Sequence, residues 1–223
     1  MSSTFEYADQ SQMFSGPLPR LYPILDRAFV STREELAAMI RLWLESGVTL
    51  LQYRNKSGDA RQMLSDAREM VRLAYAYERR EQTTLIMNDR ADICLAAQFD
   101  GVHLGQEDLS PGGARVVVGS ERVIGISCHN EGQIEAADGT DANYLAIGPI
   151  FTTASKLHPD PEVGLARLAA IRKLTKKPLV AIGGIDRRNC RAVIDAGADS
   201  VAVIRELFQA PIKSIADFHS ILR

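Results

Sequence analysis

From Leu21 onward, short apolar runs alternate with longer stretches in which apolar and polar residues recur at helical spacing. The apolar runs are rich in valine, isoleucine and leucine, and several are almost uninterrupted. This pattern is typical of parallel strands that are covered on both faces. We predict eight strands, over residues 21–26, 49–54, 84–89, 101–105, 122–127, 144–149, 178–184 and 200–204.

A segment with helical character follows each predicted strand. The clearest begins at Thr32, where Glu35 stands three residues later as in a capping box, and it ends at Gly47. We predict helices over 32–47, 61–80, 164–175, 187–196 and 212–222, and shorter ones over 90–97, 111–118 and 131–138.

Repeated strand–helix units predict an α/β fold. Eight of them in one chain indicate a (β/α)8 TIM barrel, a closed sheet of eight parallel strands. A doubly wound open sheet is the alternative, but no GxGxxG follows the first strand. Because no linker interrupts the pattern, we predict a single catalytic barrel over residues 20–223. Residues 1–19 form a polar N-terminal extension that we expect to be poorly ordered.

Composition narrows the class of protein. Of the 223 residues, 46% are hydrophobic and 24% are charged, and the net charge of −2 does not favour binding to nucleic acid or membrane surfaces. Cys94, Cys128 and Cys190 are odd in number and lack CxxC spacing, which argues against disulfides or a zinc cluster. No apolar run approaches the ~20 residues that cross a bilayer. We predict a cytoplasmic protein with small-molecule partners, and a homo-oligomer is left open.

Polar residues gather where the predicted strands end. In a TIM barrel the carboxyl ends of all strands meet at one face, and that face carries the active site. Helix caps alone would give scattered Ser, Asp and Asn, whereas these positions include acids, cations and a glycine pair. The strand-end residues are Gln52, Arg54, Lys56, Asn88, Asp89, Gln106, Asp108, Ser127, His129, Gly183, Gly184 and Arg205.

Gln52, Arg54 and Lys56 alternate along the second strand, which predicts that they share one face. Two cations and an amide suit the oxygens of a phosphate or diphosphate, and Arg can bind them with two hydrogen bonds. The alternative is a solvated strand end with unrelated charges.

Asp89 and Asp108 follow neighbouring strands. Two carboxylates at a phosphate-binding rim suit Mg²⁺, which takes one or two carboxylates together with water and substrate phosphate. Each acid alone could be a helix cap, but the pair favours a metal site. We expect His103, within a short strand, to be a packed and hydrogen-bonded residue.

The long connection that begins GPIFTTASK, at 148–156, contains small hydroxylated residues and one lysine. Such a loop can fold over an anion and exclude water. Gly183 and Gly184 lie at the end of the seventh strand, the usual phosphate-binding position of this fold. The sequence therefore predicts a ligand with phosphate groups at two places on the rim.

These motifs together resemble the thiamine phosphate synthase family. The resemblance covers about Leu21 to Phe208 and is carried by LQYRNK, NDRADICLA, DGVHLGQED, IGISCHN, YLAIGPIFTTASK, VAIGGI and GADSVAV. It implies an Mg²⁺-dependent transferase of thiamine biosynthesis. That enzyme joins hydroxymethylpyrimidine diphosphate to thiazole phosphate and releases thiamine phosphate and diphosphate.

The resemblance also implies roles for individual residues. Asp89 and Asp108 would bind Mg²⁺, and Lys156, Ser127 and Arg54 would act in catalysis. The residues implied for the pyrimidine diphosphate are Gln52, Arg54, Lys56, Asn88, Ser127 and Lys156. Those implied for the thiazole phosphate are Thr153, Ser155, Gly184, Ile204 and Arg205.

Two positions depart from the family pattern. Ser155 replaces a threonine and keeps the hydroxyl, whereas Arg205 stands where a small hydroxylated residue is common. Arg205 either adds charge at the thiazole phosphate or turns outward. Two other functions are retained as alternatives: a thiazole tautomerase on the same barrel, and a non-catalytic protein that binds thiamine precursors.

Overall fold

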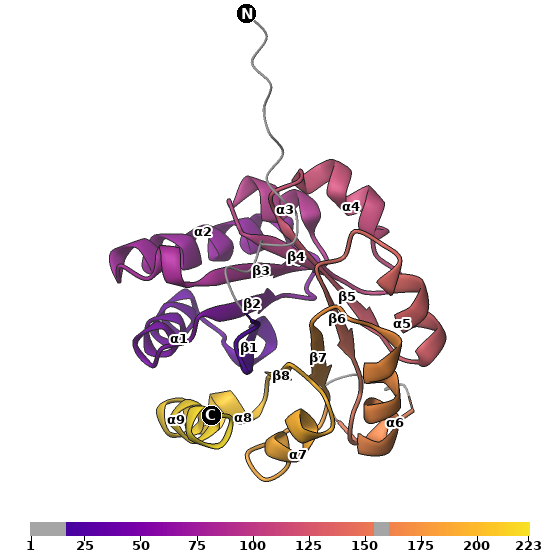
Figure 1. Ribbon diagram of the computed structural model, residues 1–223. Coiled ribbons are helices and arrows are strands. Elements are labelled where there is room, and N and C mark those ends of the chain that lie inside the picture. The colour runs from indigo at the N-terminus through magenta and orange to yellow at the C-terminus, as the bar shows by residue number, and fades with distance from the viewer. Residues whose placement is uncertain (1–16, 154–160) are drawn as a thin grey trace, which may run out of the picture.

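Eight parallel strands form a closed barrel in which the last strand pairs with the first. The computed structural model describes residues 17–153 and 161–223. The strands are β1 (Leu21–Asp26), β2 (Leu50–Arg54), β3 (Thr84–Asn88), β4 (Gly101–Leu104), β5 (Val123–Cys128), β6 (Tyr144–Ile147), β7 (Leu179–Ile182) and β8 (Ser200–Val203). All eight predicted strands are confirmed to within two residues at each end. In Figure 1 the chain colours run round the barrel from β1 to β8.

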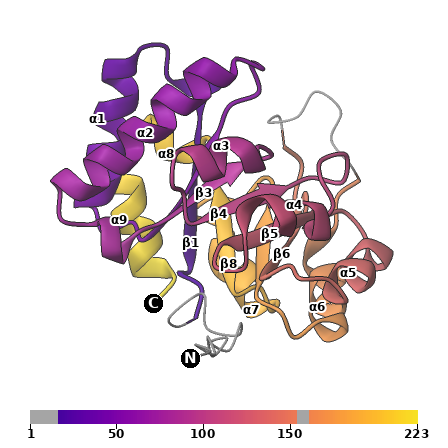
Figure 2. The same cartoon turned by 90° about the horizontal axis from the view of Figure 1, so that it is seen from above.

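Helices lie outside the strands, as Figures 1 and 2 show from two directions. They are α1 (Arg33–Glu45), α2 (Ala60–Ala76), α3 (Ala91–Ala96), α4 (Pro111–Val118), α5 (Glu131–Asp138), α6 (Gly164–Ile171), α7 (Cys190–Asp195), α8 (Glu206–Gln209) and α9 (Pro211–Ile221). The capping box predicted at Thr32 is confirmed. The Thr32 hydroxyl accepts from the Glu35 N–H at 3.1 Å, and the Glu35 carboxylate accepts from the Thr32 N–H at 3.2 Å.

Helices α2, α6 and α7 are shorter than predicted. Helix α6 ends at Ile171, where a 3₁₀ helix (Arg172–Leu174) follows, and α7 begins only at Cys190. Helix α2 ends at Ala76 rather than at residue 80, because Glu78 adopts φ 53 and leaves the helical region. Beyond it, Arg80 donates to both oxygens of Asp100 at 2.9 and 2.7 Å, which holds the chain against the turn before β4. The short helix α8 was not predicted, since four residues are too few to show helical spacing.

Apolar side chains pack in two separate layers. One lies between the sheet and the helices and includes Trp43. The other fills the barrel interior and includes Ile24, Ile86 and Val180. Leu18 belongs to this interior layer and is only 6% exposed, although it lies within the predicted N-terminal extension. Packing of the barrel therefore begins before residue 20.

The three cysteines are free and buried, which confirms that they form no disulfide. Burial raises the pKa of the Cys94 and Cys128 thiols to about 12, so these thiols stay protonated at neutral pH. In the part of the chain that the structure describes, no helix has the length and apolar character needed to span a bilayer.

Candidate active site

Arg54 ends β2 and lies directly beside Asp26, the last residue of β1. The parallel register pairs the two positions, and the Arg54 guanidinium donates to the Asp26 carboxylate. Asp26 is 5% exposed, and its other oxygen accepts from the Ala28 N–H at 3.0 Å. Asp26 therefore positions Arg54 at the rim. Asp26 was not predicted as a site residue, although an acid at a strand end is the signal that identified Asp89.

Lys56 lies beyond the end of β2, not on the strand face predicted for it. The strand stops at Arg54, and the Lys56 ammonium lies 2.5 Å from Oδ2 of Asp89. Asp89 adopts φ 63, a conformation that residues with a β-carbon seldom adopt. Its N–H donates to the carbonyl of His103 at 2.7 Å, so the neighbouring strand holds this unusual backbone.

Asp108 lies against Asp89, as the pairing of strand ends predicted. Its Oδ2 accepts from the Gly105 N–H at 2.7 Å, which ties the carboxylate to the turn after β4. Burial raises the pKa of Asp89, and contact with the Asp108 carboxyl raises it further, while Lys56 acts in the opposite direction. Two carboxylates held together in this way repel each other, and a divalent cation would remove the repulsion.

The donor set fits Mg²⁺. Two carboxylates are what Mg²⁺ takes from a protein when substrate phosphate and water complete its coordination. Across residues 17–153 and 161–223 there is no cluster of three or more His, Cys, Asp or Glu of the kind that would hold a metal unaided. Asp89 and Asp108 would therefore hold Mg²⁺ together with a phosphorylated ligand.

Asn88 offers a hydrogen-bond donor beside this pair. Its Nδ2 is buried and has no hydrogen-bond partner in the described residues. A buried donor without an acceptor costs about 1–3 kcal/mol, so an oxygen from a ligand would be favourable here. This position at the end of β3, next to Asp89, suits a phosphate oxygen.

Ser127, on β5, ends a line of hydrogen bonds that crosses the barrel interior. Its Oγ lies 2.8 Å from Nε2 of His103, and Nδ1 of His103 lies 2.9 Å from the Tyr144 hydroxyl. The Tyr144 hydroxyl lies 2.9 Å from that of Tyr22, which accepts from Nε2 of Gln52 at 3.0 Å. We call these five residues the interior chain: Gln52, Tyr22, Tyr144, His103 and Ser127. The expectation that His103 is a packed, hydrogen-bonded residue is confirmed, and burial lowers its pKa to about 4.

Tyr22 and Tyr144 were not selected from the sequence. Each is the single aromatic residue of a mostly apolar strand, LYPILD and YLAI, at a position that faces the barrel interior. A polar aromatic residue on an inward position was the available signal. It identifies a buried hydroxyl but not the partner of that hydroxyl.

Two other strand-end residues bind backbone at the rim. Nδ1 of His129 donates to the carbonyl of Gly148 at 2.8 Å, which links β5 to the end of β6. Nε2 of Gln106 donates to the carbonyl of Ser127 at 2.6 Å, which links the turn after β4 to β5. Both contacts join neighbouring strand ends and so hold the rim together.

Four of the residues implied for the thiazole phosphate follow β6, β7 and β8, on the other side of the rim from β2 and β3: Thr153, Gly184, Ile204 and Arg205. Gly184 adopts φ 64, and a β-carbon there would lie 2.6 Å from the carbonyl oxygen of Thr152, so the loop after β6 passes close to the loop after β7. Thr153 is the next residue in that loop. Ser155 and Lys156 lie outside the described residues.

Ile204 and Arg205 follow β8. Ile204 packs against the interior apolar layer. Arg205 is exposed, and its guanidinium carbon lies 5.9 Å from the centre of the Phe29 ring, within the range of a cation–π contact. Phe29 in turn stacks on Phe208 with ring centres 4.8 Å apart. Of the two orientations considered for Arg205, the structure shows the outward one.

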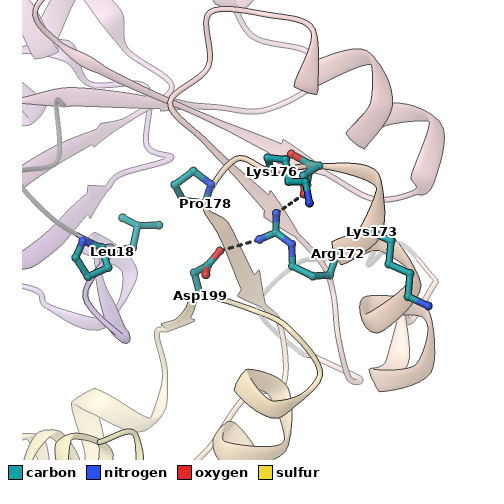
Figure 3. A pocket seen from close by; sticks show the side chains of 8 residues that line it. Leu18, Arg172, Lys173, Lys176, Pro178 and Asp199 are labelled. Atoms are coloured by element: carbon teal, nitrogen blue, oxygen red, sulfur yellow. Dashed lines mark hydrogen bonds and ion pairs between the residues drawn. The ribbon is translucent and has the colours of Figure 1, made fainter. Parts of the chain in front are cut away.

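A hollow of about 570 Å³ lies at the opposite end of the barrel (Figure 3). It is bordered by Pro178 and Asp199, which precede β7 and β8. Arg172 crosses this region and donates to Asp199 at 2.8 Å and to the carbonyl of Lys177 at 2.9 Å. These contacts tie together the amino ends of neighbouring strands, far along the barrel from the strand-end residues.

Comparison with known proteins decides the family. A family model described as thiamine monophosphate synthase matches residues 21–207. The chain belongs to the thiamine monophosphate synthase family. The family match spans all eight strands of the barrel and therefore includes every strand-end residue described above, which confirms the resemblance seen in the motifs.

Relatives within the thiamine monophosphate synthase family resemble the chain over most of its length. A thiamine-phosphate synthase of Koribacter versatilis is 56% identical over 214 residues, which cover 94% of this chain and 99% of that protein. One from Chloroflexus aurantiacus is 40% identical and covers 86% of each chain. The structure of a thiamine phosphate pyrophosphorylase from Pyrococcus furiosus is 31% identical, with a TM-score of 0.78, and the alignment covers 91% of this chain and 95% of that one.

Proposed function

We propose that this protein is a thiamine phosphate synthase whose active site is the rim at the carboxyl ends of the strands. It joins 4-amino-2-methyl-5-hydroxymethylpyrimidine diphosphate to thiazole phosphate and releases thiamine phosphate and diphosphate. Membership of the thiamine monophosphate synthase family supports this reaction. The observation that carries the placement of the site is the contact between Asp89 and Asp108 beside the Lys56 ammonium.

The diphosphate binds where positive charge and hydrogen-bond donors converge. Arg54 and Lys56 face its oxygens, and the Asn88 amide supplies the donor that lacks a partner in the described residues. Gln52, Ser127 and Lys156 complete this group in our proposal. Asp89 and Asp108 hold Mg²⁺, which when bound neutralises charge on the diphosphate and makes it a better leaving group.

The reaction begins when the bond between the pyrimidine methylene and the diphosphate oxygen breaks. The electron pair leaves with the diphosphate, and the electron-rich pyrimidine stabilises the positive carbon. Arg54, Lys56 and Lys156 stabilise the negative charge that develops on the leaving oxygens. The thiazole nitrogen then donates its electron pair to that carbon. No side-chain nucleophile is required, so positioning both substrates is the main task of the protein.

The thiazole phosphate binds on the other side of the same rim. Thr153 and Ser155 supply hydroxyls, and Gly184 allows backbone N–H groups to approach phosphate oxygens. Ile204 and the backbone of Arg205 border this position in our proposal, while the Arg205 side chain points outward. The close approach between the loop after β6 and Gly184 supports it, because that approach brings Thr153 near the glycine turn.

We further propose that the protein acts in the cytoplasm. Its three cysteines are free and buried, which suits a compartment where thiols stay reduced. A homo-oligomer also remains a prediction. Sedimentation analysis of the purified protein tests that prediction.

The proposed function is tested with purified protein and both substrates, in Mg²⁺ and in EDTA. We expect thiamine phosphate and diphosphate in equal amounts with Mg²⁺ and neither with EDTA. Isomerisation of the thiazole phosphate without coupling would indicate the tautomerase instead. Binding of either substrate without any turnover would indicate a protein that only binds thiamine precursors.

A further inference from the structure

The hydrogen bonds of the interior chain all run in one donor-to-acceptor direction, which follows from the number of hydrogens that each group carries. The Nε2 group of Gln52 can only donate, so the hydroxyl oxygen of Tyr22 accepts from it. Tyr22 has one hydrogen of its own, and the Tyr144 hydroxyl, 2.9 Å away, can accept it. The first two bonds therefore both run from β2 through β1 toward β6.

Counting hydrogens in the same way assigns the donors and acceptors between Tyr144 and Ser127 at the rim. Once the Tyr144 oxygen accepts from Tyr22, its own hydrogen can go to Nδ1 of His103 at 2.9 Å. A neutral imidazole whose Nδ1 accepts must carry its hydrogen on Nε2, which lies 2.8 Å from Oγ of Ser127. Ser127 therefore accepts from the barrel interior and keeps its own hydrogen for the rim.

We propose that Tyr22, Tyr144 and His103 are positioning residues that fix the Ser127 hydroxyl as a hydrogen-bond donor toward the bound diphosphate. This inference rests on the proposed function, because it takes the diphosphate to lie at the rim beside Ser127. The three residues act through Ser127 and touch no reacting atom.

The surroundings of the two tyrosines support this role. Tyr22 is 1% exposed and Tyr144 is fully buried, and their neighbours in the barrel interior are aliphatic. A buried hydroxyl costs free energy unless it is hydrogen-bonded, and aliphatic side chains would fill the same space without that requirement. The His103 ring also stacks on Tyr144 at 22° with centres 5.5 Å apart, so the imidazole has little freedom to rotate.

The opposite direction requires a different amide orientation. If Oε1 of Gln52 faced Tyr22, each hydrogen would point the other way and the Ser127 hydroxyl would donate to His103. Ser127 would then present only lone pairs to the rim, which would repel a diphosphate oxygen. The two directions therefore predict opposite tautomers of His103 and opposite roles for Ser127.

Nitrogen-15 NMR of the imidazoles measures the tautomer directly in the resting protein. The chain has four histidines, and a His103→Gln variant assigns the signal. We expect hydrogen on Nε2 and an unprotonated Nδ1 at neutral pH. Hydrogen on Nδ1 instead would overturn the proposal. Since this measurement needs no turnover, its result is independent of whether the protein makes thiamine phosphate.

A double-mutant cycle tests the route through Ser127. We expect Tyr144→Phe to lower kcat about tenfold in the wild type and less than twofold in a Ser127→Ala background. An equal loss in both backgrounds would mean that Tyr144 acts by some other route, and would overturn the proposal.

Tyr53→Phe is the matched control for this cycle. Tyr53 is also fully buried, but its hydroxyl donates to Asp66 at 2.7 Å, outside the barrel interior. We expect this variant to lose some thermal stability and to keep its kcat within about twofold of the wild type. If Tyr53→Phe lowered kcat as much as Tyr144→Phe, the effect would be one of general stability, and the positioning role would be wrong.

Discussion

The ring of Tyr144 occupies the space in which a side chain at Gly125 would lie. The two residues are partners in the parallel register of β5 and β6, and a β-carbon at 125 would overlap the ring and the hydroxyl. Because Gly125 has no side chain, Tyr144 can extend across the barrel interior. Its hydroxyl thereby reaches both His103 and Tyr22.

The first prediction concerns this pair. Gly125→Ala should destabilise the protein by about 1–3 kcal/mol, because an extra methyl group in a packed interior displaces the ring. It should also lower kcat, since the displaced hydroxyl no longer meets His103. Denaturant unfolding and steady-state kinetics measure the two effects.

Gly132→Ala is the matched control for that substitution. Gly132 is exposed in α5, and the nearest atom to an added β-carbon lies 3.6 Å away. Alanine should stabilise this helix by about 0.5–1 kcal/mol, because glycine is the poorer helix former. A Gly125→Ala variant as stable as the wild type would contradict the packing described for Tyr144.

The second prediction concerns Asp26, which holds Arg54. Asp26→Asn should raise the KM for pyrimidine diphosphate about tenfold, because the guanidinium loses its charged partner and its fixed position. The KM for thiazole phosphate should stay unchanged, since its proposed position lies on the other side of the rim. Steady-state kinetics with each substrate varied in turn separates the two values.

Asp199→Asn is the control for Asp26. Asp199 also pairs with an arginine, Arg172, but at the amino ends of the strands. This variant should lose stability and keep both KM values. Equal rises in the two KM values for Asp26→Asn would mean that Asp26 supports the fold and does not position Arg54.

The third prediction concerns pH and stability. The pKa of Asp89 is raised in the folded protein, so ionisation of this carboxyl opposes folding. Its contribution to stability is fully present below the ordinary Asp pKa of about 3.9 and is lost as the pH rises through the raised value. Asp89→Asn should therefore raise the Tm at pH 7 and leave it unchanged at lower pH. Asparagine also tolerates the φ of 63 at this position.

Asp92→Asn should behave in the opposite way. A hydrogen bond from Arg90 lowers the pKa of Asp92, so its ionised form favours folding. The contribution of Asp92 is present above its ordinary pKa and is lost as the pH falls through the lowered value. The Tm of Asp92→Asn at pH 7 should therefore lie below that of the wild type. Scanning calorimetry at several pH values measures both variants. A Tm for Asp89→Asn below that of the wild type at pH 7 would contradict the conclusion that ionisation of Asp89 opposes folding.

Much of the barrel could be predicted because its determinants are local. Apolar runs, helical spacing and caps such as Thr32 lie within short stretches of sequence, and the strand order follows from repeated units. The pairing of Asp89 with Asp108 could also be predicted, because both acids end neighbouring strands. The N-terminal boundary could not, since Leu18 is buried by contacts with strands distant in sequence.

The interior chain and the partner of Arg54 could not be predicted, for a different reason. Tyr22, Tyr144 and Gln52 meet only after the barrel closes, and their contacts depend on register and on the space at Gly125. The prediction that Lys56 shares a strand face with Gln52 and Arg54 was also wrong, because the alternation of side chains stops where β2 ends at Arg54, and Lys56 reaches Asp89 from the loop beyond that end. Such contacts are set by packing between elements.

The central claim is that Asp89 and Asp108 hold the Mg²⁺ used in thiamine phosphate synthesis. The most direct measurement is the initial rate of thiamine phosphate formation in Mg²⁺ for the wild type, Asp89→Asn, Asp108→Asn and Asp92→Asn. We expect the first two variants to lose about a hundredfold or more in rate and Asp92→Asn to match the wild type. Rates close to wild type for Asp89→Asn and Asp108→Asn, measured in Mg²⁺, would contradict the account.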